Sequence, residues 1–118
     1  MKRMVIKGSE WHRGGKYQMG DAPALLTAFG RRCCIGIHAR VCGIPDDHIQ
    51  GVSQPESMKQ KHVVKCYRPW IRTSDDSDIC GDAMSINDDD MTSDEKKIAL
   101  LRPIFAEIGV SIVWRPEL

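Results

Sequence analysis

The stretch TSDEKKIALLRPIFAEIGVSIVW, residues 92–114, decides the fold, because it carries the clearest helix and strand signals of the chain. Thr92 with Glu95 three residues later is a capping box, in which hydroxyl and carboxylate each accept a hydrogen bond from a backbone amide at a helix start. Apolar residues then recur at spacings of three, four and three, the period of a helix with one buried face: Ile98, Leu101, Phe105 and Ile108. The pattern predicts a helix packed on a core through this face.

Gly109 is suited to end this helix, and the apolar, β-branched residues 110–114 predict a terminal strand. Pro103 inside the helix lacks an amide hydrogen, so we expect a kink near residue 99. A similar short apolar stretch, residues 4–6, predicts a first strand near the other end of the chain. We expect these two strands to be neighbours in one small sheet.

The middle of the chain adds further elements. Residues 33–42 predict a helix, since Cys34, Ile37, His38 and Val41 share one helix face and Gly43 follows as a cap. Residues 62–67 have strand-like composition that ends at Pro69, and residues 79–86 predict a short helix. The predicted fold is a single α+β domain over residues 1–118, with a short sheet of the terminal strands packed against two or three helices.

Composition favours an ordinary globular chain. Its 118 residues are 42% hydrophobic and 28% charged, without an apolar run long enough to cross a membrane. Lys7 interrupts the N-terminal apolar stretch before a signal peptide could develop, so we expect a soluble intracellular protein. Residues 1–72 hold 13 Lys and Arg against 5 Asp and Glu, whereas residues 73–118 hold 4 against 11. Either the two halves fold against each other and their fields cancel, or they offer a basic and an acidic binding face.

A zinc site is one interpretation of the cysteines and histidines. Cys34 and His38 are four residues apart, and so are His62 and Cys66, which together supply the two thiolates and two imidazoles of a structural zinc site. If residues 62–66 form a strand, however, its ends lie about 13 Å apart, too far for one ion. The alternative is that most of the five cysteines are small buried side chains in a reducing compartment, without a cofactor.

Two charged surfaces are candidate binding sites. An acidic one would imitate the phosphates of a nucleic acid and occupy a basic channel of a partner: Asp75, Asp76, Asp78, Asp88, Asp89 and Asp90. A basic one, with its indole exposed, would contact DNA or RNA directly: Trp11, Arg13, Lys16, Arg31 and Arg32. No nucleophile has an evident base beside it and no phosphate-binding loop is present, so we expect a protein that is not an enzyme.

The segment Gly30-Arg31-Arg32-Cys33-Cys34-Ile35-Gly36 resembles a group of small uncharacterised proteins of phages and other mobile elements. In that group a Gly-x-x-Cys-Cys-Leu-Gly segment is followed by Cys-Gly and Asn-Asp-Asp, matched here by Cys42-Gly43 and residues 87–89. A final helix, a glycine and a terminal strand complete the likeness, while Ile35 and Pro103 depart from it.

The resemblance implies an accessory protein in the cytoplasm of a bacterial host, and it supplies no catalytic role. Small phage proteins of this kind often bind a host protein or nucleoprotein complex, and anti-CRISPR inhibitors of host defence are a prominent class. We therefore expect a protein-binding inhibitor that uses the acidic surface. A zinc-stabilised nucleic-acid-binding module is the alternative.

Overall fold

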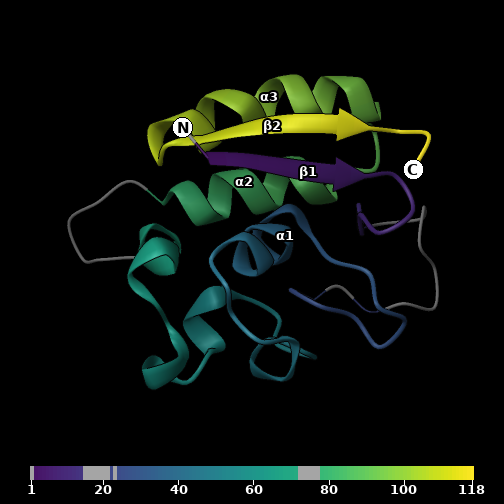
Figure 1. The fold of residues 1–118 in the computed structure, drawn as a ribbon. Coiled ribbons are helices and arrows are strands. Elements are labelled where there is room, and N and C mark those ends of the chain that lie inside the picture. The colour runs from purple at the N-terminus through teal and green to yellow at the C-terminus, as the bar shows by residue number, and fades with distance from the viewer. Residues whose placement is uncertain (1, 15–21, 23, 72–77) are drawn as a thin grey trace.

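The computed structural model describes residues 2–14, 22, 24–71 and 78–118. Along the described chain, regular elements follow in the order β1 (Lys2–Lys7), α1 (Cys34–Val41), α2 (Ile79–Asp88), α3 (Asp94–Glu107) and β2 (Val110–Arg115) (Figure 1). Short 3₁₀-helices lie between α1 and α2: η2 (Asp46–His48), η3 (Pro55–Ser57), η4 (Gln60–His62) and η5 (Lys65–Trp70). No helix within the described ranges is long and apolar enough to cross a bilayer.

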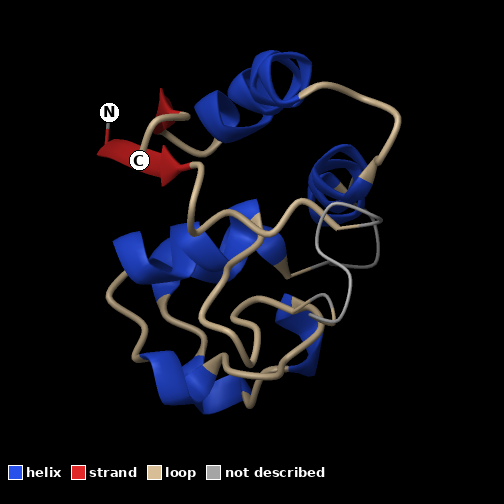
Figure 2. Cartoon of the chain, turned by 90° about the vertical axis from the view of Figure 1, so that its right-hand side faces the viewer, coloured by secondary structure: helices blue, strands red, loops and turns tan. Residues whose placement is uncertain are grey.

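The terminal strands form the sheet, as predicted. β1 and β2 pair in parallel, with Lys2 opposite Val110 and Lys7 opposite Arg115. Alternate residues of both strands are buried, which places Met4 and Ile112 on the core side. α3 runs beside β2 and α1 lies nearer β1, with η2, η3 and η4 farther from the sheet than α1 (Figures 1 and 2). The chain is thus one α+β arrangement of a two-stranded sheet and three main helices.

The N-cap of α3 lies one residue later than predicted, so Thr92 and Glu95 do not occupy the two capping-box positions. Ser93, not Thr92, is the N-cap, and its Oγ accepts from the amide of Lys96 at 3.3 Å. The Thr92 hydroxyl instead donates to Asp89 at 2.6 Å, because the turn before α3 offers it a carboxylate. The helix continues past Pro103 to Glu107. Ile98, Leu101 and Phe105 of the predicted apolar face are buried, and Ile108 at the C-cap is partly buried.

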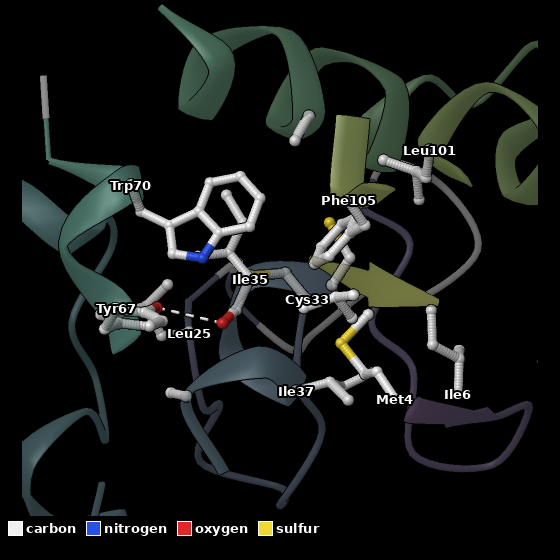
Figure 3. Packing of buried hydrophobic residues seen from close by; sticks show 14 of the residues in the cluster. Met4, Ile6, Leu25, Cys33, Ile35, Ile37, Tyr67, Trp70, Leu101 and Phe105 are labelled. Carbon is white, nitrogen blue, oxygen red and sulfur yellow. Dashed lines mark hydrogen bonds between the residues drawn. The ribbon is translucent and has the colours of Figure 1, made fainter. Parts of the chain in front are cut away.

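The predicted strand at residues 62–67 is wrong, since this segment runs from the last residue of η4 into the first half of η5. Tyr67 and Trp70 are both fully buried although they are three residues apart. A strand would place them on opposite faces, whereas a 3₁₀-helix brings residues i and i+3 to the same side. The Tyr67 hydroxyl donates to the Ile35 carbonyl at 3.0 Å, which fastens η5 to α1 (Figure 3).

α1 lies at the centre of the core. Its residues Ile35 and Ile37 are fully buried, and Figure 3 shows them among side chains from β1, α3 and η5. Gly36 brings this helix against the backbone of Leu25, so closely that a Cβ on Gly36 would collide with the Leu25 carbonyl group. The glycine of the Cys-Cys-Ile-Gly segment is therefore required by packing, not by backbone conformation.

We predict that Gly36→Ala destabilises the fold by about 3 kcal/mol, because the methyl group meets a backbone carbonyl that cannot move aside as a side chain would. Urea unfolding followed by circular dichroism measures the change. Gly43→Ala is the matched control: no atom lies within 4 Å of its added Cβ, so only the positive φ of 80° opposes it, at about 1 kcal/mol. Equal losses in the two variants would refute the packing argument.

Candidate functional site

The structure separates the four predicted zinc ligands. Cys34 is buried at the start of α1, and the ring of His62 stacks on His48 with centroids 3.6 Å apart. His38 and Cys66 do lie near each other, but the third member of their group is Cys42. Cys34 lies at the start of α1, whereas Cys42, eight residues later at its C-cap, is the cysteine next to Cys66.

His38 is a neutral, buried imidazole. Its Nδ1 accepts a hydrogen bond from the Trp70 indole at 2.8 Å, and its ring lies among Tyr67, Trp70 and Phe105. Burial, with a smaller contribution from Lys2, lowers the pKa of His38 to about 4. Because Nδ1 accepts from Trp70, the single ring proton belongs on Nε2.

The two sulfur atoms beside this ring form a disulfide. Cys42 at the C-cap of α1 is joined to Cys66 at the start of η5, with Cα atoms 5.6 Å apart. Cys42 Sγ lies 3.9 Å from Nδ1 and 3.6 Å from Nε2 of His38, so the sulfur packs against the ring instead of lying along one nitrogen's lone pair. The expectation that most of the cysteines are small buried side chains does not extend to this pair.

This arrangement does not fit zinc. A metal needs thiolates, whereas these sulfurs are bonded to each other. It also needs an imidazole nitrogen with a free lone pair, but Trp70 occupies Nδ1 and Nε2 carries the proton. The group of His38, Cys42 and Cys66 is better described as a disulfide packed in an aromatic cluster.

The other three cysteines are buried thiols, as the alternative interpretation predicted. Burial raises the pKa of Cys33 to about 11 and that of Cys80 to about 12, and it raises the pKa of Cys34 well above its usual value. A thiol that stays protonated is a poor nucleophile and a poor metal ligand.

Some carboxylates of the predicted acidic surface already accept hydrogen bonds within the fold. Asp75 and Asp76 lie outside the described residues. Asp78 is the N-cap of α2 and accepts from the amide of Gly81 at 2.8 Å, and the half-buried Asp88 accepts from the Asn87 side chain at 2.8 Å.

The turn between α2 and α3 presents the rest of this surface. Asp89 accepts from the Met91 amide at 3.0 Å and from the Thr92 hydroxyl at 2.6 Å, and these hydrogen bonds lower its pKa. They also fix the turn in one conformation. Beside them, Asp90 is half-buried and the Met91 side chain is 85% exposed. We call residues 89–91 the acidic turn.

The predicted basic surface is not assembled as an exposed patch. Trp11, expected to be exposed, is fully buried, because its indole donates to Asn87 at 2.7 Å. Arg32 is buried and paired with Asp46 at 2.8 Å. Arg13 is paired with Asp94 at 3.0 Å and lies over the Trp11 ring. Arg31 is half-buried, and Lys16 lies outside the described residues.

Asn87 joins three segments through one buried amide. Its Oδ1 accepts from the Trp11 indole at 2.7 Å and from the Cys34 amide at 3.0 Å, and its Nδ2 donates to the His12 carbonyl at 2.9 Å. The buried Lys97 ammonium donates to the Asn87 carbonyl at 2.8 Å, close to the C-terminus of α2. The Cys-Cys and Asn-Asp-Asp motifs thus meet at this side chain.

Sequence spacing carried a signal for these buried polar residues that our sequence analysis missed. Asn87 lies seven residues after Cys80, on the buried face of α2, and Lys97 lies four residues before Leu101 on the buried line of α3. A polar residue on an apolar helix face predicts a buried hydrogen-bond network.

Comparison with known proteins found no protein family, curated protein or solved structure that matches this chain.

We predict that Asn87→Ala destabilises the fold by about 3 kcal/mol, because it leaves the buried Trp11 and Cys34 N–H groups without their acceptor. A double-mutant cycle with Trp11→Phe, measured by urea unfolding, separates this loss from packing. The coupling between the two sites should exceed about 1 kcal/mol. Additive losses would show that the 2.7 Å hydrogen bond contributes little.

We predict that stability falls on acidification because of His38, whose pKa is about 4 in the fold against 6.5 for the free side chain. Between these pH values the unfolded chain binds a proton that the folded chain does not, so acid favours unfolding. The free energy of unfolding falls by about 3 kcal/mol in total, and this loss is complete only below the pKa of the folded state. Urea unfolding from pH 7 to pH 4 measures it.

His38→Gln should flatten this pH dependence, because it keeps an acceptor for Trp70 but does not titrate in this range. His62→Gln is the control, since His62 is only partly buried and its pKa is also lowered. If both variants keep the slope of the unchanged protein, His38 is not the responsible group.

Proposed function

We propose that this chain is a non-enzymatic accessory protein of a phage or other mobile element, which binds a protein or nucleoprotein complex of its bacterial host. Inhibition of a host defence complex, in the manner of anti-CRISPR proteins, is the activity that we propose for it. The observation that carries the proposal is the acidic turn, where an 85% exposed Met91 stands next to Asp89 and Asp90.

An exposed methionine contributes nothing to the core, but its flexible, polarisable side chain suits a binding surface. Met91 is held at the tip of a turn whose conformation is fixed by the two hydrogen bonds of Asp89. A partner that binds it therefore orders little further backbone, which reduces the entropic penalty of association.

The charges of the turn indicate the partner's chemistry. Carboxylates beside an apolar anchor complement an apolar pocket with a basic rim, and a channel that binds nucleic acid has such a rim. The interaction should weaken with salt, because exposed charges are screened. The alternative, a zinc-stabilised nucleic-acid-binding module, has less support, because its ligands are separated and Trp11 and Arg32 are buried.

The chain offers a closely matched pair of variants for a test. Asp90→Lys with Met91→Ser changes the acidic turn, and Glu117→Lys with Leu118→Ser makes the same changes in charge and polarity at the exposed residues 117 and 118. Each is immobilised, with the unchanged protein, and exposed to host lysate for quantitative mass spectrometry.

We predict that a host complex recovered by the unchanged protein and by the 117/118 variant is recovered at least about tenfold less by the 90/91 variant, the loss expected for a central apolar anchor. When the same three proteins are expressed in a host that carries a nucleic-acid-guided defence, the unchanged protein and the 117/118 variant should restore phage plating more than the 90/91 variant does. Equal recovery by all three proteins would remove the acidic turn from the proposal. Binding of DNA or RNA by the purified chain alone would favour the alternative.

A further inference from the structure

Two of the five cysteines differ from the others in their accessibility. Cys42 and Cys66 are half-buried, whereas Cys33, Cys34 and Cys80 are buried. Thiol chemistry on the folded protein is thus confined to one pair, which the structure joins as a disulfide.

The disulfide closes the least regular part of the chain. Residues 43–65, all of them described, contain three 3₁₀-helices but neither an α-helix nor a strand. Four side chains of the segment are buried in the core: Ile44, Ile49, Pro55 and Met58. Backbone hydrogen bonds at Gly51 and Val52 also join it to residues 25 and 26, and all these contacts lie within residues 44–58, ahead of its Cys66 end. A segment with so few buried contacts opens at low free energy unless something else holds its ends.

A cavity of about 540 Å³ depends on the same segment. Most of its lining lies between the two half-cystines and the remainder just beyond Cys66: Pro55, Glu56, Met58, Gln60, Val63, Arg68 and Ile71. The shape of this cavity is therefore set by how well the segment is held.

The ends of the segment are held together by more than the sulfur atoms. Immediately after Cys66, Tyr67 donates to Ile35 at 3.0 Å and Trp70 donates to His38 at 2.8 Å, so η5 is tied to α1 by two hydrogen bonds. These bonds do not need the disulfide. After reduction they alone hold this end of the segment, so it opens more often than in the oxidised form, and each closure brings the two thiols together again for re-oxidation.

We propose that Cys42 and Cys66 form a reversible redox site that exchanges with low-molecular-weight thiols of the glutathione class, and that its oxidation state controls the order of residues 43–65 and the shape of the cavity. This inference is independent of the binding function proposed above. A disulfide that closes an otherwise loosely packed segment is a means of switching that segment between a held and a released state.

The exchange balances in two steps. The thiolate of the reagent attacks one sulfur, forms a mixed disulfide and releases the other cysteine as a thiolate, which takes up a proton from water. A second reagent thiolate attacks the reagent sulfur of the mixed disulfide and releases the second cysteine. Two reagent thiols are oxidised to one disulfide, and the protein gains two electrons and two protons.

The test equilibrates the full chain in mixtures of reduced and oxidised glutathione, traps free thiols with N-ethylmaleimide, and measures intact mass. We expect one transition from no adduct to two adducts, located at residues 42 and 66 by peptide mapping. Cys80→Ala should leave this transition unchanged, since that thiol is buried.

Limited trypsin digestion of the same samples reports on the segment, because Lys59, Lys61 and Lys65 are exposed within it. Cleavage there should be about tenfold faster in the reduced form, while cleavage at Lys96 on α3 stays constant. Cys42→Ser with Cys66→Ser should match the reduced form in every mixture.

Three results would overturn the proposal. A disulfide that resists every glutathione ratio is a permanent structural bond. Cleavage rates that do not follow the oxidation state mean that the bond does not control the segment. One zinc ion per reduced chain that protects both thiols from maleimide would make the pair a metal site. The mass measurement needs only the unchanged protein, so it holds even if the double variant does not fold.

Discussion

The fold depends on one buried amide, that of Asn87, whose oxygen accepts two hydrogen bonds and whose nitrogen donates two. Both N–H groups that donate to this oxygen are buried, so the loss of their acceptor would destabilise the fold. The end of α2, the start of α1 and the segment around Trp11 must therefore meet in a single arrangement. Apolar packing alone tolerates small shifts between such elements, whereas directional hydrogen bonds at this junction do not.

A second polar centre, His38, serves the opposite end of α1. It is neutral at physiological pH, and its acceptor nitrogen receives the indole hydrogen of Trp70. α1 is thus fixed by a hydrogen-bonded polar group at its start and another near its end, with Ile35 and Ile37 packed between them. The apolar residues supply most of the driving force for folding, and the two polar groups select which packing is adopted.

Local signals explain what the sequence predicted. The apolar spacing of residues 98–108, the glycine after it and the β-branched ends specify α3 and the two strands by near-neighbour rules, and these elements are confirmed. The burial of Trp11 was not predictable in this way, because its partner lies 76 residues along the chain. Cys42 was overlooked for the same reason, since its neighbour Cys66 lies 24 residues away. The strand expected at residues 62–67 does not form, because Tyr67 and Trp70 are three residues apart and both are buried in the core, which a 3₁₀-helix allows and a strand does not.

The parallel pairing of β1 with β2 has a consequence for synthesis of the chain. Lys2 pairs with Val110, so every hydrogen bond of the sheet joins residues separated by more than a hundred positions. During translation β1 emerges before β2 and stays without its partner until residues 110–115 have left the ribosome. α1 and its neighbours have the opportunity to gather before that point, but the sheet does not. Its formation closes a loop of more than a hundred residues, which makes it a late and entropically demanding step.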